Sequence, residues 1–562
     1  MKGFKTVPVV LLAIILAACS QQAPDAFIAV NLVGYNTDDP KHALLVNRQA
    51  AEFEITNEDG SEIYYSGSIE EVFMPDAVTG DTTSLIDFSD FKSEGEFMIR
   101  VNASPEIPPQ KVTIGTNVYE DTSLTAIQSY YYHRCGTPVQ NEKPWNHNGC
   151  HINDAPFYDD HDQHRDVTGG WHDAGDYGKF SINTSLSSGL LLYLYEMRPE
   201  RFTDSQLDIP EAGNGIPDLL DEVKWALDWL LKMQNENGGI FHKVVQKEWI
   251  GEFLPEDDPG QRYIFEITST STAGFAAVAA LGAQLYKNDA PVFSDKLEEA
   301  ALNAWQFLQQ EPDIVPAGGF QNPPDVAGGE YGDSYDRDER LWASIELYKL
   351  TGDESYLIFF INVYPELLHG EIPPLSWRNF HAMALSAFLN SEVPELYKPH
   401  QDIIQSALME HAERLLQQTH ENNYQTLLKH EEYYWGSASV NLGYAYLLIQ
   451  LYEKTGDSKY YEKALDQLHY TLGRNPFNHT FLTGMGEASV QNPYHQFSME
   501  LNASGPVPGM MVGGPNNHLP EHEDKISSYP GKSYQDDEKN FRVNETAINF
   551  TAIFVFVAGY FI

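Results

Sequence analysis

One short pattern occurs twice in the second half of the chain and limits the folds that the chain can adopt. The segments LYKLTGDESYL (residues 347–357) and LYEKTGDSKYY (residues 451–461) share a helical apolar spacing that stops at Thr-Gly and resumes after Asp. Glycine commonly ends a helix, and aspartate is a favoured cap for the next one. Each copy therefore predicts two helices joined by a tight turn. Such pairs cannot bury their apolar faces alone and must stack on one another.

The same helical texture runs from Asp121 to the end of the chain. Twelve helical stretches can close as six pairs, so we predict an (α/α)6 barrel over residues 121–562, with an open α-solenoid as the alternative. The helices are expected to begin near Thr122, Thr184, Pro217, Ser271, Lys296, Asp336, Ser355, Ser376, Gln401, Ser437, Ser458 and Asn544.

Residues 27–118 have a different texture. Seven short runs rich in β-branched and aromatic residues follow one another, and polar turns such as Asn57–Gly60 separate them. Several of these runs alternate apolar and polar residues with a period of two, which is typical of a half-buried strand. The sequence therefore predicts a mainly α protein in which a small antiparallel β-sandwich precedes the barrel.

The charge balance excludes some partners. The chain carries 35 Lys and Arg residues against 81 Asp and Glu residues, for a net charge of −46. A field of that sign repels nucleic acid and other polyanions, so no nucleic-acid partner is expected. A hydrophobic content of 42 % is ordinary for a globular protein with large cores.

The first 22 residues have the pattern of an export signal. Lys2 and Lys5 precede an apolar run, Val7–Ala18, and Cys19 follows Leu-Ala-Ala. That ending resembles the bacterial lipobox, which implies a lipid on Cys19, and Ser20 fits sorting to the outer membrane. A plain signal peptide is the alternative. We expect an exported, monomeric lipoprotein that meets the membrane only through its lipid anchor. The apolar C-terminus, residues 546–562, is short for a span and reads as a buried helix.

The segment GGWHDAGDYGKF, residues 169–180, is the strongest candidate for chemistry. Asp173 and Asp176 stand three residues apart on a glycine-rich stretch ahead of an apolar helix. Two aspartates there could simply cap that helix. A third carboxylate, Glu545, is expected at the start of the final helix, where glutamate also commonly acts as a cap.

These two segments together resemble the catalytic pattern of glycoside hydrolase family 9. The resemblance covers about residues 27–562 and includes NGIPDLLDEVKWALDWLLKMQ, YGDSYDRDERLWASIELYKLTGD, GRNPFNHTFLTGMG and PVPGMMVGGPN. The β-rich region, with VNLVGY and DFSDFKSEGEFMIRV, resembles the immunoglobulin-like module that precedes many catalytic domains of this family. The resemblance implies inverting hydrolysis of β-1,4-glycosidic bonds in a β-glucan. It also implies Asp176 as base, Asp173 as holder of the water and Glu545 as acid.

The residues expected to contact sugar depart from the family pattern. The family normally reads Pro-His-x-Arg where this chain has Pro493-Tyr494-His495-Gln496, and Phe541 stands where tyrosine is usual. His495 could replace the missing histidine by a one-residue shift. We therefore keep an exo-β-glucosaminidase acting on chitosan oligosaccharides as an alternative, with Glu487 as partner of the amine. A non-catalytic carbohydrate-binding surface lipoprotein is the alternative of another class. The predicted substrate-binding residues are Tyr494, His495, Gln496, Trp435, Tyr331 and Phe541.

Two cysteines and two histidines form a predicted zinc site. Cys135, Cys150 and His151 resemble a site found in one branch of the family, and two thiolates with imidazoles suit structural zinc. His172 is expected as the fourth ligand because the zinc-bearing branch reads GGWHDAGD there. His161 and His164 are the competing ligands, and a Cys135–Cys150 disulfide is the alternative to metal. Calcium is common in the family, although no EF-hand spacing occurs here.

Overall fold

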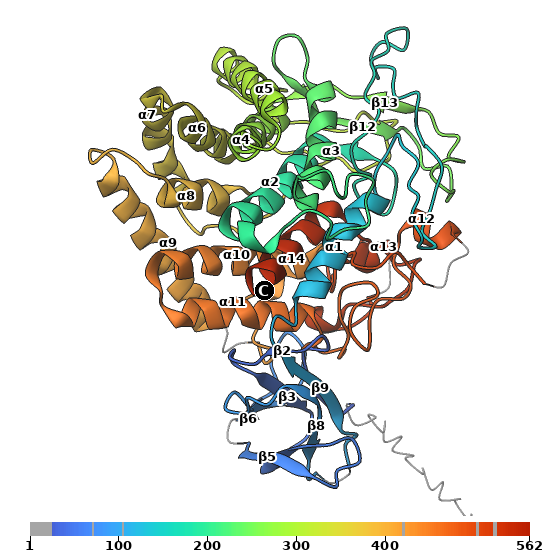
Figure 1. Ribbon diagram of the computed structural model, residues 1–562, viewed down its shortest axis with the longest axis vertical. Coiled ribbons are helices and arrows are strands. Elements are labelled where there is room, and N and C mark those ends of the chain that lie inside the picture. Colours follow the sequence, from blue (N-terminus) through green and yellow to red (C-terminus); the bar gives the residue numbers. More distant parts are fainter. Residues whose placement is uncertain (1–24, 70–71, 104–105, 419–421, 502–504, 521–524) are drawn as a thin grey trace, which may run out of the picture.

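The computed structural model describes residues 25–69, 72–103, 106–418, 422–501, 505–520 and 525–562 (Figure 1). The predicted signal peptide and Cys19 lie outside these residues. A small β-sandwich stands below a large helical body. Among the residues described, no helix is long and apolar enough to cross a membrane.

The sandwich contains nine strands in the described residues, two more than the runs seen in the sequence, and most neighbours pair antiparallel. One sheet has the order β1-β3-β7-β6 and the other β2-β9-β8-β4-β5, in which β2 and β9 run parallel. Buried side chains from both sheets, including Tyr35, Phe53, Phe88 and Ile99, form its core. The strands are β1 (27–29), β2 (35–36), β3 (42–46), β4 (52–56), β5 (63–68), β6 (72–73), β7 (83–87), β8 (95–101) and β9 (110–115).

The helical body is a closed barrel. Within the described residues, twelve helices have ten residues or more, and each begins within five residues of its predicted position. Six of them form a ring in which each contacts the next, in the order α2-α4-α6-α8-α10-α14 and back to α2. The closed ring rules out the open solenoid. The twelve are α1 (120–132), α2 (181–197), α3 (218–233), α4 (269–285), α5 (291–310), α6 (337–351), α7 (354–363), α8 (381–390), α9 (398–418), α10 (437–455), α11 (458–471) and α14 (548–560).

The sequence of each helix explains its layer. The ring helices α2, α4 and α14 are buried on nearly all sides, as helices that are apolar all round must be. The outer helices α3, α5 and α11 each have one buried apolar face, and the opposite face is exposed in α5 and partly buried in α3. The repeated Thr-Gly-Asp turns behave as predicted. Gly352 and Gly456 end α6 and α10 in the left-handed conformation, and the Asp353 and Asp457 carboxylates cap α7 and α11.

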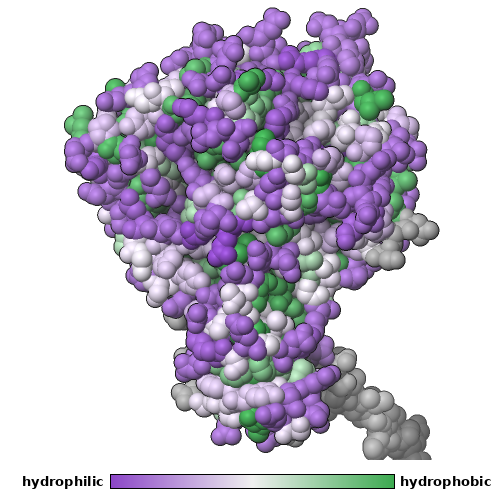
Figure 2. All heavy atoms as spheres, in the orientation of Figure 1, coloured by the Kyte–Doolittle hydropathy of each residue, from purple (hydrophilic) through white to green (hydrophobic). Residues whose placement is uncertain are grey.

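The sandwich is tied to the barrel by buried polar contacts. Asp81 accepts hydrogen bonds from the Tyr424 hydroxyl at 2.9 Å and from Lys532 Nζ at 2.6 Å. The Leu32 amide donates to the Leu472 carbonyl at 2.8 Å. Figure 2 shows a largely hydrophilic surface, with hydrophobic side chains gathered at the neck between the two parts. The sandwich and barrel therefore share an interface with its own apolar and charged contacts.

Candidate active site

The segment 169–180 is a buried loop that ends in β10 (179–180), directly before α2. Asp173 is fully buried, and its carboxylate accepts hydrogen bonds from Asn183 Nδ2 at 2.9 Å and from the Tyr331 hydroxyl at 3.0 Å. Asp176 accepts from the Gly178 amide at 2.8 Å. Neither side chain caps α2, whose N-cap residue is Phe180. The helix-cap interpretation of these two aspartates is therefore wrong.

The sequence suggested that Glu545 lies at the start of the final helix, but the structure places it before that helix. It follows the short helix α13 (541–544) in extended conformation, three residues before α14 begins at Ile548. Its backbone lies beside Tyr494 in a parallel bridge, and its carbonyl accepts from the Gly513 amide at 3.0 Å. Neighbouring strands, and not a helical turn, therefore fix the position of the carboxyl group.

Backbone contacts bring the three carboxylate-bearing segments together. The Ile548 amide donates to the Asp173 carbonyl at 2.8 Å, and the Gln496 amide donates to the Gly175 carbonyl at 2.8 Å. Gly175 has no room for a side chain, because a Cβ there would lie 2.4 Å from the Tyr494 ring. The aspartate loop, residues 494–496 and Glu545 thus form one packed unit.

The electrostatics of the unit differ from one carboxyl to the next. Burial, followed by the negative charges of Asp176 and Asp173, holds the pKa of Glu545 well above its usual range. Burial raises the pKa of Asp173 to about 7, against the hydrogen bonds from Asn183 and Tyr331. Burial also raises the pKa of Asp176, but the Gly178 amide, Arg262 and Lys243 oppose it. Glu545 is therefore the group best suited to remain protonated near neutral pH.

Asp536 is not among the charges that raise the pKa of Glu545, which belong to Asp176 and Asp173 of the aspartate loop. Asp536 instead accepts from the amides of Gln491 and Asn492 and from Asn544 Nδ2. It therefore holds the 491–494 loop against the residue that precedes Glu545.

Three predicted sugar-binding aromatics form a continuous row. Trp435 is 40 % exposed and its ring centroid lies 5.5 Å from that of Phe541, which is 37 % exposed. The Phe541 ring lies 5.8 Å from that of Tyr494, whose backbone pairs with Glu545. The row therefore leads from the surface to the carboxylates. Trp249, 61 % exposed, lies near the Tyr494 hydroxyl, where it opposes the rise in the pKa of Tyr494 that burial causes.

Two other predicted sugar-binding residues are buried. His495 is bonded through Nδ1 to Ser498 Oγ at 2.8 Å, and its ring packs against His133. Gln496 is also buried, and its amide supports Gly175. The one-residue shift suggested for His495 therefore puts it in the interior beneath the loop. Glu487 is wrong as an amine partner in this site, because it pairs with Lys111 of β9 at 3.2 Å.

Sequence reasoning missed the polar contacts of Tyr331 and its neighbours. We expected Tyr331 to stack on sugar, but its hydroxyl is committed to Asp173. The rings of Phe180 and Trp377 pack against it at 4.5 and 4.9 Å. Asn183, on the first turn of α2, is the other partner of Asp173. Its place three residues after the 169–180 segment was the one signal in the sequence.

The predicted metal ligands come together as a group. The nearest ligand atoms of Cys135, Cys150, His151 and His172 all lie within 4.8 Å of one another. Both cysteines are free and buried, so the disulfide alternative does not hold in this structure. Two sulfurs and two imidazole nitrogens at this spacing suit a tetrahedral metal ion. His161 stacks on Tyr263 and His164 bonds to the Asn153 carbonyl, so neither competitor joins the group.

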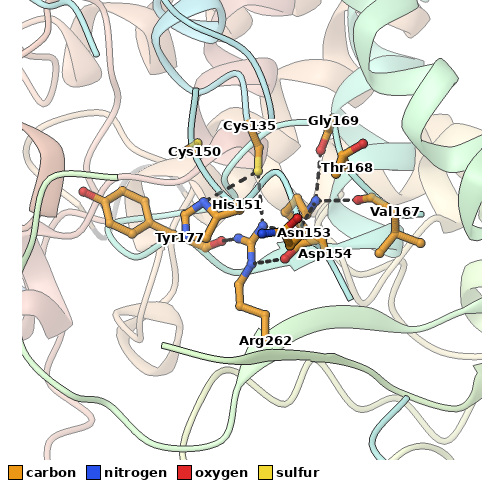
Figure 3. Close-up of polar contacts among 12 residues, drawn as sticks. Cys135, Cys150, His151, Asn153, Asp154, Val167, Thr168, Gly169, Tyr177 and Arg262 are labelled. Atoms are coloured by element: carbon orange, nitrogen blue, oxygen red, sulfur yellow. Dashed lines mark hydrogen bonds and ion pairs between the residues drawn. The ribbon is translucent and has the colours of Figure 1, made fainter. Parts of the chain in front are cut away.

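The surroundings of this group also suit a metal centre. His151 Nε2 lies 3.1 Å from Asp258 Oδ2, a carboxylate–histidine pair that leaves Nδ1 facing Cys135. Figure 3 shows the guanidinium of Arg262 between Asp154, the Tyr177 carbonyl and Cys135 Sγ. Burial alone would raise the pKa of Cys135, but Cys150, Lys179 and Arg262 lower it well below its usual range. A thiolate, the form that binds metal, is therefore favoured at Cys135.

A second buried acidic group stands at the start of α6. Both carboxylate oxygens of Glu339 and one oxygen each of Asp338 and Asp333 have no hydrogen-bond partner. Burial raises the pKa of Glu339 well above its usual range, and Asp338 and Asp333 add to the effect. Calcium, expected from the resemblance, stays a prediction.

Comparisons with known proteins agree with this geometry. The family model of glycosyl hydrolase family 9 matches residues 119–558, and that of the cellulase N-terminal immunoglobulin-like domain matches residues 23–106. Endoglucanase D of Acetivibrio thermocellus is 30 % identical over 96 % of this chain and 84 % of its own length. A xyloglucan-specific endo-β-1,4-glucanase of Bacteroides ovatus is 29 % identical over 98 % of this chain and 96 % of its own.

The structural comparison gives the same answer. A crystal structure of a zinc-binding triple mutant of a family 9 endoglucanase superposes with a TM-score of 0.86 and 31 % identity, over 94 % of this chain and 99 % of the other. The (α/α)6 barrel, the immunoglobulin-like sandwich and the sequence matches all agree. The chain is a glycoside hydrolase that belongs to family 9, with an immunoglobulin-like domain ahead of its catalytic barrel.

Proposed function

We propose that this enzyme hydrolyses β-1,4-glycosidic bonds of a β-glucan with inversion at the anomeric carbon. The observation that carries the proposal is the packed unit of Asp173, Asp176 and Glu545, in which burial and both acidic neighbours hold the pKa of Glu545 well above its usual range, whereas the Gly178 amide and two cations oppose the rise at Asp176. An inverting hydrolase needs one protonated and one ionised carboxyl on opposite sides of the sugar, with space for a water between them.

In this mechanism Glu545 is the general acid. It gives its proton to the glycosidic oxygen as the bond to the anomeric carbon breaks, so the leaving sugar departs as an alcohol. The negative charges of Asp176 and Asp173 keep that proton in place until transfer. The extended backbone beside Tyr494 holds the acid at the inner end of the aromatic row.

Asp176 is the general base. It takes a proton from a water molecule that attacks the anomeric carbon from the opposite face of the ring. The Gly178 amide, Arg262 and Lys243 favour its ionised form. Asp173, fixed by Asn183 and Tyr331, orients the same water through its remaining hydrogen-bonding capacity.

A glucan is the substrate that the aromatic row favours. Trp435, Phe541 and Tyr494 offer neutral ring faces, on which the C–H faces of glucose units stack. Relatives carry the names endoglucanase, cellodextrinase and xyloglucan-specific endoglucanase. The exo-glucosaminidase alternative loses support, since Glu487 pairs with Lys111 of the sandwich.

We further propose that Cys135, Cys150, His151 and His172 hold a structural zinc ion. The donor set is the one zinc prefers, and the ligand atoms lie close enough to share one ion. When bound, zinc would cross-link the 135–151 region to the loop of Asp173, which directly follows His172. We also propose that the mature chain is a monomer anchored by a lipid on Cys19 at the outer membrane.

The decisive experiment is a product analysis on cello-oligosaccharides and on glucosamine oligomers, with proton NMR of the anomeric configuration. We expect α-configured products from glucan and none from glucosamine oligomers. Asp176→Asn and Glu545→Gln should each lower kcat at least about 100-fold, in the range of general acid–base contributions, with unchanged circular dichroism. Sugar binding without release of reducing ends would instead identify a carbohydrate-binding protein.

A further inference from the structure

Tyr331 has an unusual backbone conformation. Its φ angle is +46°, in the left-handed region that aromatic residues rarely adopt. Such a conformation costs about 1–3 kcal/mol and persists only where the surroundings impose it. In this conformation the Tyr331 hydroxyl lies 3.0 Å from Asp173 Oδ2. Some part of the protein must therefore hold the residues on either side of Tyr331.

The backbone carbonyls of Gly329 and Glu330, the two residues before Tyr331, are each hydrogen-bonded to a side chain. These side chains belong to Lys243, the first residue of β12 (243–246), and to His242, which precedes it. Lys243 Nζ donates to the Gly329 carbonyl at 2.6 Å. His242 Nε2 lies 2.8 Å from the Glu330 carbonyl. Because these two carbonyls are consecutive, fixing both fixes the peptide plane that leads into Tyr331.

The chemistry of His242 fits a donor to that carbonyl. Burial lowers the pKa of His242 to about 3, so the ring is neutral and carries a single N–H. Its Nδ1 lies 3.3 Å from the Thr268 hydroxyl, which can donate to it. The N–H is then on Nε2, directed at the Glu330 carbonyl. Its ring also stacks on Phe320 at 4.0 Å.

Lys243 lies in a cage of aromatic rings. Its Nζ lies 5.6 Å from the Phe180 ring centroid, 4.9 Å from that of Phe265 and 5.0 Å from that of Phe320. Burial lowers the pKa of Lys243 to about 7, while the negative charges of Glu330 and Asp176 and the surrounding ring faces favour its ammonium form. Nζ also donates to Asn322 Oδ1, and Asn322 Nδ2 donates to the Gly328 carbonyl at 2.7 Å. The ammonium thus gathers both ends of the 320–331 loop around one point.

Phe180 connects this cage to the catalytic carboxylates. It pairs with Lys243 across β10 and β12, and its ring lies 4.5 Å from that of Tyr331. Phe180 ends the segment that carries Asp173 and Asp176. The cage, the loop and the aspartates are therefore in mechanical contact.

We propose that Lys243 and His242 act as a clamp that holds Tyr331 in its left-handed conformation and so keeps its hydroxyl on Asp173. We call these two side chains the 242–243 clamp. They are positioning residues for hydrolysis: both hold the loop that carries Tyr331, and Lys243 affects Asp176 only through its charge, which moves the pKa of Asp176 and not the plateau of kcat. The inference deepens the proposed function and rests on Asp173 orienting the water.

A double-mutant cycle tests this route of action. Lys243→Met keeps the length of the side chain inside an apolar cage, and Tyr331→Phe removes only the hydroxyl. We expect each single change to lower the kcat plateau of the pH profile about 10- to 100-fold, the scale of a misplaced catalytic group. The double variant should lose no more than about twofold beyond Tyr331→Phe, because the clamp has nothing left to position.

Two further variants separate positioning from general packing. Lys247→Met is the matched control, since Lys247 also lies over two tyrosine rings and pairs with Asp325 of the same loop at 3.3 Å, but does not reach Gly329. It should leave kcat unchanged. Asn322→Ala, on the partly exposed loop, should lower kcat about 3- to 10-fold without changing the melting temperature. It replaces Lys243→Met if that variant does not fold.

The outcomes distinguish the clamp from the proposed function. Losses that multiply in the double variant, or a Lys243→Met enzyme with the kcat of the wild type, overturn the clamp while leaving hydrolysis in place. An inactive wild-type enzyme overturns the proposed function. In that event the crystal structure of Lys243→Met decides the clamp, which requires the φ angle of Tyr331 to leave the left-handed region.

Discussion

Glu545 shows how a single side chain carries both chemistry and a cost in stability. Burial and its acidic neighbours raise its pKa well above that of an unfolded glutamate, near 4.3. As pH rises, the unfolded chain therefore loses this proton before the folded chain does. The contribution of Glu545 to folding is present in full below the unfolded pKa, and it declines as pH rises toward the folded pKa.

The prediction for this residue follows from that sign. Glu545→Gln cannot ionise, so its stability relative to the wild type should increase between pH 4 and pH 8, by about 1.4 kcal/mol for each unit of raised pKa that this window covers. Urea unfolding at the two pH values measures the difference. A stability difference that is the same at both would show that the carboxyl is not perturbed in the folded state.

The residues of the site differ in how far the sequence could predict them. Asp173, Asp176 and Glu545 stand in segments that resemble family motifs, and the predicted group of two cysteines and two histidines, drawn from the same resemblance, does come together in the structure. The partners of Asp173 were not, since Tyr331 reaches it only through a left-handed backbone that no local pattern indicates. The prediction that Glu487 meets an amine of the substrate was wrong because its partner, Lys111, lies on β9 of the sandwich, far away in the sequence.

At the scale of elements, the proposed metal centre joins a helix end to the aspartate loop. Cys135 follows α1, whereas His172 lies in the 169–180 loop. Removing the metal should lower the melting temperature by at least about 1–2 °C, the shift that a loss of about 1–2 kcal/mol produces in a catalytic domain that spans residues 119–558. Differential scanning calorimetry before and after chelation measures the shift, and two thiols should titrate in the denatured, chelated protein.

Asp258 supplies a more specific test of the same centre. Its carboxylate bonds His151 Nε2 from the loop between β12 and β13 (262–264), and such partners tune metal affinity about 10- to 100-fold. Asp258→Asn should therefore release zinc to a competing chelator that leaves the wild type loaded. His161→Ala is the control, because His161 lies outside the ligand group. Equal zinc retention by all three proteins would argue against the proposed ligands.

The helix pairs and their closure into an (α/α)6 barrel were predicted from the sequence, whereas several short backbone pairings were not. The Thr-Gly-Asp turns predicted where α6 and α10 end and where α7 and α11 begin, because helix caps depend only on neighbouring residues. The two additional short strands of the sandwich and the extended link at Glu545 depend on pairing with remote segments. No window of neighbouring residues contains that information.

At the scale of the whole molecule, Asp81 links the sandwich to the barrel. It is buried, and it accepts from Tyr424, Lys532 and Asn47. Asp81→Ala leaves the Lys532 ammonium and the tyrosine hydroxyl without their acceptor, so we expect a loss of about 2 kcal/mol or more. Chemical denaturation followed by tryptophan fluorescence measures it. Asp59→Ala, in an exposed turn of the sandwich, is the matched control and should leave the unfolding midpoint where it is.

The closed ring of helices has a consequence for biosynthesis. The ring closes only when α14 inserts between α10 and α2, and Glu545 directly precedes that helix. A nascent chain in which α14 has not yet inserted has neither a closed ring nor Glu545 in its place beside Tyr494. Until α14 inserts, the apolar sides of α2 and α10 that it covers lack their partner. This is therefore the folding stage at which the barrel is most prone to aggregate. Ring closure and the placement of Glu545 thus depend on the same helix, so hydrolytic activity requires α14 to be in place.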